Sequence, residues 1–434
     1  MKGGGPVAYI ASPELAKVSS LLPSNKQRSM IVHSLVKALG LMNNQCEGRS
    51  LNRRCLKIIA PKKASYKDLA VYHSRDYLDT VLDPKLTGET LTVSVNSEYG
   101  LEDDCPRFLG LPEYIQLVGG ATLTAVLALQ RDISDISICW DGGRHHARKS
   151  QASGFCYVAD CILAIMMLKR PTPSPALAQT PESLSPSPPS PPPLAARKPR
   201  IMYLDLDLHF SDAVSEAFYT PTPSIIPPQI LTLSIHHTAP GFFPVSASAG
   251  LPSPSSDSEE HPFDPFTLSL PLKQGASART YARLWSIVEH IRTTFRPDFI
   301  VLQCGCDALA GDPCKVFNWS IGPVDEPGTM GWCIAQVLKW EGKKLMLGGG
   351  GYNSANTARA WAYLTSIAIN DPLSLDTDIP DHAGFPLYGP SFTLDVPGGV
   401  MADTNTEEYM LELESLYLGD NGAIAALKKR MDGP

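Results

Sequence analysis

Three ionisable side chains alternate with leucines in the stretch IMYLDLDLHFSD. Asp205, Asp207 and His209 are each two residues apart, a spacing that places them on one face if the segment is a strand. Burying three such groups at the end of a strand is costly unless they are paired or bind a cation. Carboxylate and imidazole groups suit zinc, and a carboxylate-rich set also suits iron, manganese or cobalt. The motif therefore predicts a metal site, with an acidic cluster held by hydrogen bonds or salt bridges as the alternative.

A third ligand is expected from another strand end, because ligand sites of open α/β sheets form where strands end. Asp307 is the candidate, since it follows the apolar run 299–303 in the segment VLQCGCDALAGDP. A lone aspartate at this place is more often the N-cap of a helix, so its neighbours decide between the two interpretations. A metal held by Asp207, His209 and Asp307 would keep an open coordination position for water, as catalytic metal sites require.

The adjacent histidines of WDGGRHHA admit three interpretations: metal ligands, acid–base catalysts, or polar residues of an exposed turn. If the metal takes its ligands from elsewhere, His145 and His146 are available for proton transfer, because histidine titrates near neutral pH. Asp205 and Asp212 are the carboxylates available to fix the tautomer of each ring. Tyr352 follows four glycines in LGGGGYN and can donate a hydrogen bond to a developing oxyanion. Activated water, a base and an oxyanion donor together suit amide hydrolysis.

These polar groups follow apolar runs of strand length that alternate with helix-like runs along the chain. Strands are predicted at residues 133–140, 201–209, 231–236, 299–303 and 344–347, and helices at 114–130, 157–169, 278–295 and 354–369. The alternation predicts a mostly parallel sheet covered by helices on both faces. Parallel strands end at the same edge, so the polar clusters that follow four of these strands are predicted to form one site.

Two segments interrupt the alternation. Residues 171–199 hold 11 prolines among many serines, which predicts a disordered insertion within one domain, with a domain boundary as the less favoured alternative. Residues 245–261 are predicted to form a second mobile loop.

Composition limits the class of protein. Hydrophobic residues make up 43% of the 434 residues and charged ones 19%, as in soluble globular proteins, and the apolar run 158–168 is too short to cross a bilayer. The start MKGGGPVAYI does not resemble a secretory signal. The ten cysteines form no CxxC pair and several lie in apolar runs, which favours buried free thiols in a reducing compartment. The net charge of −7 disfavours broad nucleic-acid binding and permits cationic partners.

Motifs along most of the chain outside the insertion resemble those of the class I zinc-dependent histone deacetylases, in the arginase/deacetylase superfamily. They occur in the family's order: AYIASPELAKV, RSMIVHSL, DCP at 104–106, GGAT, GGRHHA with SGFCYVAD, YLDLDLH, SIHHTAPGFFP, QCGCDALAGDP, LGGGGYNSANTARAW and IPDHAGFPLYGP. The resemblance implies a three-layer arginase/deacetylase α/β fold with an eight-stranded, mostly parallel sheet and helices on both faces. It implies a catalytic domain over residues 8–395, interrupted by the insertion 171–199, and a C-terminal extension, 396–434, with a terminal helix.

The activity implied by the resemblance is metal-dependent hydrolysis of N6-acetyl-lysine in proteins, with release of acetate. The implied metal is Zn²⁺, with Fe²⁺ as the alternative, and K⁺ is implied beside it. Acetylated histone tails or other nuclear proteins are the implied substrates, with no direct binding of nucleic acid or membranes. The short tail resembles the branch that acts outside large corepressor assemblies and deacetylates cohesin, so corepressor partners are left open. We expect a nuclear protein, with the cytoplasm as a second location.

Two other functions compete with this one. The first is an amidohydrolase of the same fold that acts on acetylpolyamines or other small molecules. A carboxylate at Asp104 and aromatic residues at Phe155 and Phe243 favour a peptide substrate over a polyamine. The second is a non-catalytic acetyl-lysine binder, which would have lost a metal ligand or the tyrosine, and the sequence retains them all.

The resemblance also assigns roles to individual residues. Asp207, His209 and Asp307 match the zinc ligands, His146 the principal general base and acid, and His145 a mainly electrostatic partner that stays protonated for longer. The remaining matches are Asp205 and Asp212 behind the histidines, Tyr352 on the acetyl carbonyl, Asp104 at the rim, Gly154, Phe155 and Phe243 along the tunnel, Cys314 and Gly350 beside the pocket, and Arg28 and Cys156 near the internal cavity and the floor of the site.

Potassium is implied in two places. The site beside the zinc would use the region of Asp205, Asp207, His209, Ser234 and Ile235. A second site would involve Phe218 and neighbouring carbonyls, but Phe266 stands where the family has a tyrosine.

Five residues depart from the family's pattern. Phe210 and Ser211 replace a histidine and a glycine, and Arg144 stands where an apolar residue is usual. Asp103 replaces an aromatic residue before DCP, and Cys314 replaces a larger apolar residue. These changes leave the expected catalytic groups intact and bear on substrate preference.

Overall fold

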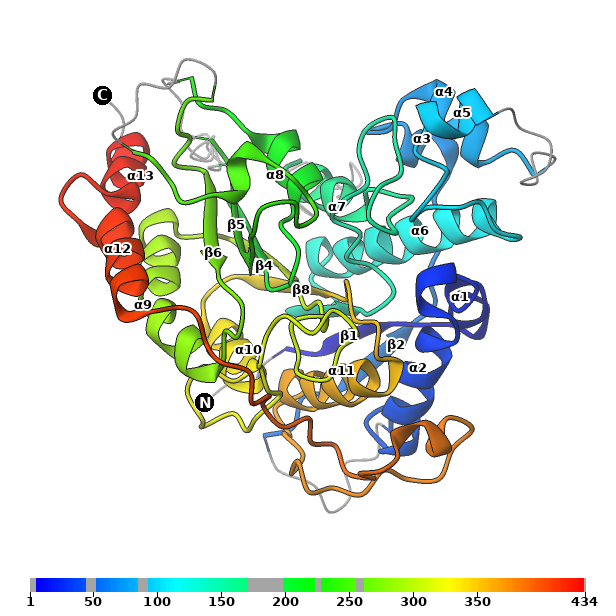
Figure 1. The fold of residues 1–434 in the computed structure, drawn as a ribbon. Coiled ribbons are helices and arrows are strands. Elements are labelled where there is room, and N and C mark those ends of the chain that lie inside the picture. Colours follow the sequence, from blue (N-terminus) through cyan, green and yellow to red (C-terminus); the bar gives the residue numbers. More distant parts are fainter. Residues whose placement is uncertain are drawn as a thin grey trace, which may run out of the picture.

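One sheet of eight parallel strands forms the centre of the computed structural model (Figure 1). The structure describes residues 5–43, 52–84, 93–170, 198–222, 228–254 and 261–432. The strands are β1 (Val7–Ile10), β2 (Leu56–Ile59), β3 (Ile136–Cys139), β4 (Ile201–Asp205), β5 (Ile230–His237), β6 (Thr267–Leu272), β7 (Phe299–Gln303) and β8 (Lys343–Leu347). Their order in the sheet is β2-β1-β3-β8-β7-β4-β5-β6. The predicted eight-stranded α/β sheet is confirmed.

Successive strand residues pack on opposite faces of the sheet, which gives the fold three layers. In β1, for example, Val7 and Tyr9 belong to one buried cluster, and Ala8 and Ile10 to the other. The first face is covered by α2 (Arg28–Ala38), α9 (Ala278–Phe295), α10 (Met330–Lys339) and α11 (Ser354–Ala368). The second is covered by α1 (Pro13–Ser19), α3 (Tyr66–Leu69), α4 (Arg75–Val81), α6 (Leu111–Gln130), α7 (Asp160–Leu168) and α8 (Asp212–Phe218). A further short helix, α5, spans Val93–Glu98.

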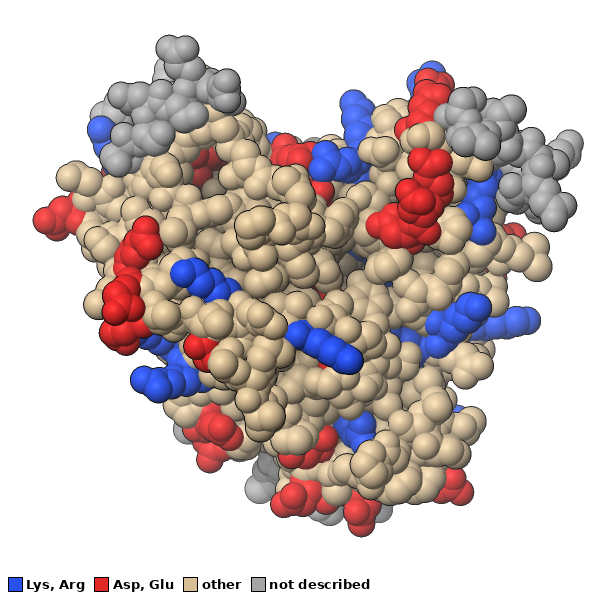
Figure 2. Space-filling model, in the orientation of Figure 1, with Lys and Arg blue, Asp and Glu red and all other residues tan. Residues whose placement is uncertain are grey.

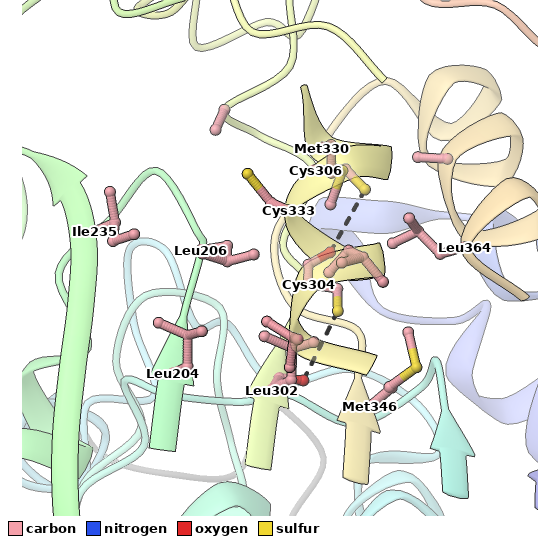
Figure 3. Packing of buried hydrophobic residues seen from close by; sticks show 14 of the residues in the cluster. Leu204, Leu206, Ile235, Leu302, Cys304, Cys306, Met330, Cys333, Met346 and Leu364 are labelled. Atoms are coloured by element: carbon pink, nitrogen blue, oxygen red, sulfur yellow. Dashed lines mark hydrogen bonds between the residues drawn. The ribbon is translucent and has the colours of Figure 1, made fainter. Parts of the chain in front are cut away.

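Sulfur-containing side chains fill part of the first buried cluster. Figure 3 shows Cys304, Cys306 and Cys333 beside Met330 and Leu302. The thiol of Cys306 donates to the carbonyl of Cys304, with 3.6 Å between sulfur and oxygen. Apart from Cys55, the cysteines of the described residues have free thiols, and all of these except Cys314 are buried, as the sequence predicts.

Two helices lie in the C-terminal segment, where the sequence predicts one. They are α12 (Glu407–Leu418) and α13 (Ala423–Asp432), and both contact α9 (Figure 1). Arg283 of α9 donates to Glu414 of α12 at 2.7 Å, and the buried Tyr417 hydroxyl donates to the carbonyl of Ser269 in β6. The boundary at residue 395 stays a prediction, and these contacts join the extension to the rest of the fold.

The strand predicted at 201–209 is too long, because β4 ends at Asp205. The Asp205 carboxylate accepts a hydrogen bond from the backbone N–H of Asp207 at 2.9 Å, and such a local side-chain bond turns the chain out of the strand. Asp207 and His209 therefore lie on the segment that follows the strand. The strand predicted at 133–140 is likewise shortened to β3, since the N–H of Ile133 bonds back to Ala128 at the end of α6.

Parts of the two predicted insertions lie outside the described residues. These parts are 171–197 of the segment 171–199, and 255–260 of the segment 245–261. The described part of the second contains a short 3₁₀ helix, η3 (Ala247–Ala249). Among the helices that the structure describes, none combines the length and apolar content needed to cross a membrane.

Candidate active site

Four neighbouring strands of the sheet end beside the polar residues that the sequence singles out. In order across the sheet they are β3, β8, β7 and β4. Because these strands are parallel, the segments that follow them, 140–146, 348–352, 304–307 and 206–212, leave the sheet at the same edge. Side chains distant in the sequence meet there.

Asp207, His209 and Asp307 form a compact group of potential metal ligands. One donor atom from each lies within 4.8 Å of the other two. The Nδ1 atom of His209 is 2.9 Å from Oδ2 of Asp307 and 3.3 Å from Oδ1 of Asp207. Both carboxylates are buried and the imidazole is largely so.

The other oxygens of the two aspartates are occupied by protein donors. Oδ2 of Asp207 accepts from the Gln303 side chain at 2.7 Å and from the N–H of Gly350 at 2.8 Å. Oδ1 of Asp307 accepts from the N–H of Leu208 at 2.9 Å. These bonds aim one oxygen of each carboxylate and one imidazole nitrogen at a common point. Two buried carboxylates and an imidazole suit a divalent metal, so the residues present fit such an ion.

The charges of this group depend strongly on one another. Burial, followed by the charge of Asp207, raises the pKa of Asp307. Burial alone would lower the pKa of His209, but its hydrogen bonds to Asp207 and Asp307 outweigh burial and raise the pKa to about 10. Two carboxylates this close favour a positive charge between them, whether a proton on His209 or a metal ion.

Each of the two adjacent histidines is held by its own carboxylate. Nδ1 of His145 lies 2.8 Å from Oδ2 of Asp205, and Nδ1 of His146 lies 2.7 Å from Oδ1 of Asp212. All four side chains are buried. A carboxylate at Nδ1 keeps the ring proton on that nitrogen and leaves Nε2 as the atom that gains or loses a proton.

The two rings have different proton affinities although their centres are only 3.9 Å apart. Burial would lower the pKa of His145, but Asp207 and Asp205 outweigh it and raise the pKa to about 9. Burial and the neighbouring charge of His145 lower the pKa of His146 to about 4. Two titratable groups whose environments separate their pKa values are typical of acid–base catalysis.

Tyr352 is positioned by the glycine loop and by the start of α11. Its N–H donates to Oδ2 of Asp312 at 2.7 Å, and the next residue, Asn353, is the N-cap of α11. Gly350, two residues before Tyr352, has no room for a side chain, since a Cβ there would lie 2.3 Å from Oδ2 of Asp307. The glycine loop therefore packs directly against the Asp307 carboxylate and positions Tyr352 beside the ligand group.

Aromatic residues form the approach to these groups. The Phe243 ring is 4.9 Å from the ring of His146, and the Phe155 ring is 5.5 Å from the ring of Tyr352. Gly154 adopts a φ of 52°, and a Cβ there would lie 2.4 Å from the His146 ring. Asp104 accepts a hydrogen bond from the N–H of Gly154 at 2.9 Å, which fixes its carboxylate at the exposed end of this approach.

Comparison with known proteins assigns the family. The model of the histone deacetylase domain matches residues 22–173 and 194–368. Histone deacetylase 8 of Danio rerio is 31% identical over 95% of this chain and 94% of its own length, and histone deacetylase 8 of Xenopus tropicalis is 33% identical over 93% and 95%. The chain belongs to the histone deacetylase family. Histone deacetylase 9 of Arabidopsis thaliana is 30% identical over 90% of this chain and 79% of its own length.

Membership of the family makes this chain a metal-dependent hydrolase that deacetylates lysine, and the class I assignment predicted from its motifs is confirmed. The N-cap interpretation of Asp307 is wrong, because the described chain continues from it through turns and α10 begins only at Met330. The deacetylase fold instead directs Asp307 toward Asp207 and His209.

Several residues of this deacetylase site were missed from the sequence. Gln303 holds Asp207, Asp312 holds Tyr352, and Arg148 donates to Asp212 at 2.7 Å. Phe242 stacks on the His209 ring with centres 5.2 Å apart. Gln303 and Asp312 lie on either side of Asp307 near a strand end, which was a usable signal. A basic residue after HHA and a second aromatic before Phe243 are common in surface loops of any function, so neither was a specific signal.

Residues predicted around potassium lie in two regions of the deacetylase fold. Asp205 of β4 pairs with Ser234 of β5, and Ile235 is the next buried residue of that strand. Phe218 packs with the cluster on one face of the sheet, and Phe266 is buried in the cluster on the other. The backbone segments of Phe218 and Phe266 nevertheless lie close together, because Asp264 accepts from the N–H of Thr220 at 2.8 Å and from the N–H of Phe266 at 3.1 Å.

The residues that depart from the family's pattern occupy both buried and exposed places. The Arg144 side chain is buried, lines a small internal cavity with Arg28, and donates to the carbonyl of Asp141 at 3.1 Å. The Phe210 ring packs against His236, and the buried Ser211 hydroxyl has no hydrogen-bond partner in the described structure. Asp103 is exposed with a φ of 48°.

The other matched residues border the same site. Arg28 donates to the carbonyls of Gly349 and Gly351 at 3.0 and 2.8 Å, and these two hydrogen bonds stabilise the glycine loop. Cys156 is buried in the segment that carries Gly154 and Phe155. Cys314 is half-buried, and its N–H donates to Asp312 at 3.0 Å.

Proposed function

We propose that this deacetylase hydrolyses N6-acetyl-lysine in protein substrates at a zinc ion held by Asp207, His209 and Asp307. The observation that carries the proposal is the pair of histidine–aspartate hydrogen bonds, at 2.8 and 2.7 Å, beside this ligand group. Zinc bound there supplies a Lewis acid that polarises the acetyl carbonyl and lowers the pKa of a water molecule.

His146 acts as the general base and then as the general acid. Asp212 keeps a proton on Nδ1, so Nε2 accepts the proton of the attacking water. When the bond between the acetyl carbon and the lysine nitrogen breaks, the same Nε2 gives its proton to the departing amine. His145, whose Nε2 lies 3.7 Å from Asp207, acts mainly through its charge.

Tyr352 stabilises the oxygen that becomes negative during attack. The hydroxyl lies on a ring held between the glycine loop and Phe155, so it donates its hydrogen bond without a large reorganisation. In the substrate approach, the rings of Phe155 and Phe243 pack on the apolar methylenes of the lysine side chain. The Asp104 carboxylate accepts from the N–H groups of the substrate backbone, as it already does from Gly154.

Potassium binds beside the zinc in this proposal, in the region of Asp205, Asp207, His209, Ser234 and Ile235. The test is turnover in matched KCl and NaCl buffers with the metal content held constant. Higher turnover in KCl supports the site, and equal turnover at all concentrations contradicts it. The second potassium site, at Phe218, stays a prediction.

The function is tested by incubating purified protein of measured metal content with an acetyl-lysine peptide and with an acetylated polyamine, and quantifying released acetate. The peptide should be hydrolysed faster, because Asp104 and the aromatic approach suit a peptide backbone and a lysine stem. A polyamine preference would instead support the small-molecule alternative. Parallel loading with Zn²⁺ or Fe²⁺ identifies the metal that supports turnover.

The proposal also covers the protein substrates and the cellular location. Histone tails and cohesin are the proposed protein substrates, and the nucleus is the proposed main location. Comparing acetylated histone and cohesin peptides separates the two substrates, and imaging a tagged chain tests the location. Exclusion of the tagged chain from the nucleus would contradict both proposed substrates.

A further inference from the structure

A cavity of about 760 Å³ opens at the edge of the sheet opposite the active site. It lies where β3 and β8 begin and where α10 and α11 end. β8 connects the two edges, since Lys344 lines the cavity and the glycine loop follows Leu347 at the other end. At about 3.3 Å per residue, the strand separates the two places by roughly 15 Å. The cavity is therefore distinct from the deacetylase site.

Lys344 is buried in the wall of this cavity and forms no ion pair with the described residues. Its residue is 6% exposed, and its ammonium donates to the carbonyl of Trp340. In the part of the chain that the structure describes, no carboxylate lies within ion-pair distance of it, whereas the adjacent Lys343 forms an ion pair at 2.6 Å. Burial, followed by the charges of Arg54 and Arg292, lowers the pKa of Lys344 to about 8. The charges of Asp135 and Glu341 act on Lys344 in the opposite sense, but neither carboxylate forms an ion pair with it. Lysine is rarely buried unless it is paired, so an anion beside this ammonium would be stabilising.

The charges around the cavity are mainly positive. Its described lining contains Arg54, Lys339, Lys343 and Lys344 against Asp135 and Glu341. Asp135 already accepts from the N–H of Gly5 at 2.9 Å. Arg54 is half-buried, and its side chain forms no ion pair with the described residues. An anion in the cavity would therefore meet two basic groups, Lys344 and Arg54, that form no ion pair within the described part of the chain.

The remaining lining is largely apolar, which argues for a ligand larger than an inorganic ion. Leu338, Trp340 and Ile367 contribute apolar surface, and the volume lies within the range of about 300–1,000 Å³ that small-molecule sites occupy. An inorganic ion would leave the apolar lining exposed to water. A neutral molecule would leave the positive charge of the Lys344 ammonium unbalanced.

We propose that the cavity binds an organic anion, whose carboxylate or phosphate pairs with Lys344 and Arg54 and whose apolar part packs on Leu338, Trp340 and Ile367. The proposal does not depend on the mechanism of the deacetylase site, because none of these residues contacts the groups assigned there. Carboxylate and phosphate are both compatible with an ammonium and a guanidinium, so the probes must separate them.

Titration calorimetry on the full-length, metal-loaded protein tests the proposal with four probes. Phenyl phosphate and benzoate carry the two head groups on one ring, benzyl alcohol is the neutral counterpart, and inorganic phosphate lacks the apolar part. At least one aromatic anion should bind, and more tightly than the other two probes. Lys344→Met and Arg54→Gln should each weaken that binding by about tenfold or more, because each removes a charged hydrogen-bond donor.

Lys343→Met is the matched control, since the ammonium of Lys343 already has an acidic partner. It should weaken binding less than Lys344→Met does. All three variants should deacetylate a peptide at the unmodified rate without probe, which shows that they fold. Tighter binding of phenyl phosphate or of benzoate identifies the head group. Absence of binding by both aromatic anions, binding of benzyl alcohol as tight as theirs, or binding unchanged in Lys344→Met and Arg54→Gln would overturn the proposal.

Discussion

Replacing Tyr352 by phenylalanine removes one hydroxyl and leaves the other contacts of this residue in place. The ring keeps its edge-to-face contact with Phe155, whose centre is 5.5 Å away. The backbone N–H keeps its bond to Asp312 at 2.7 Å, and the bond from Gly350 to Asp207 also comes from the backbone. The substitution therefore tests a single hydrogen-bond donor in the active site.

The expected effect of Tyr352→Phe is large and confined to kcat. One donor to an oxyanion contributes about 2.7–4 kcal/mol, which corresponds to a fall in kcat of about 100- to 1,000-fold. KM should change little, because the hydroxyl stabilises charge that develops only in the transition state. Acetate release from an acetyl-lysine peptide gives both constants, and elemental analysis of the same preparation gives the metal content.

Tyr66→Phe is the control, because it removes a tyrosine hydroxyl that donates to Asp79 on the protein surface. This variant should retain the unmodified kcat. A kcat of Tyr352→Phe close to that of the unmodified protein would remove the hydroxyl from the mechanism. Loss of metal from Tyr352→Phe would contradict the inference that the glycine loop supports Asp207 through its backbone alone.

The ligand group illustrates what the sequence could predict. Asp207, His209 and Asp307 were selected because polar groups at buried strand ends are costly, and the fold does place them within 4.8 Å of one another. The local structure predicted for Asp207 and His209 was wrong, because both were placed in a strand and β4 ends at Asp205. That turn requires the buried Asp205 carboxylate to bond with Asp207 and also with His145, which is distant in the sequence. A partner supplied by the fold cannot be found from strand periodicity.

The strands β1 and β2 were missed for a similar reason. β1 and β2 have only four residues each, too few to separate a strand from other short apolar runs. Their pairing with each other and with β3 stabilises them as strands. Each can be recognised as a strand only when the strand that pairs with it is known. The long amphipathic helix α9, in contrast, was predicted with its observed bounds.

Surface charges and buried charges differ in what they indicate about where ligands bind. On the face shown in Figure 2, acidic and basic side chains are scattered among uncharged ones. The formal charge of −7 therefore says little about where an acidic or basic ligand binds. The informative charges are buried ones, such as Asp207 and Lys344, because burial makes a partner necessary.

Three further predictions concern the metal, the glycine loop and pH. Asp307→Ala should lower the metal content found by elemental analysis, and a fully loaded variant would refute the ligand assignment. Arg28→Met should lower the free energy of unfolding in urea by about 2 kcal/mol, because two carbonyls of the glycine loop lose a charged donor; an unchanged midpoint and slope would contradict that role. The third perturbation is acid. His73 accepts from the N–H of Ala159 and donates to the carbonyl of Lys149, so its neutral form is built into the fold, and burial lowers its pKa from 6.5 to about 4. The unfolded chain binds this proton more readily, so the stability contribution of His73 is fully present above pH 6.5. It is lost as the pH falls toward 4, by about 3 kcal/mol in total. Denaturation from pH 7 to pH 4 should therefore show a shallower loss of stability in His73→Gln than in the unmodified protein, and parallel curves would show that His73 titrates normally in the fold.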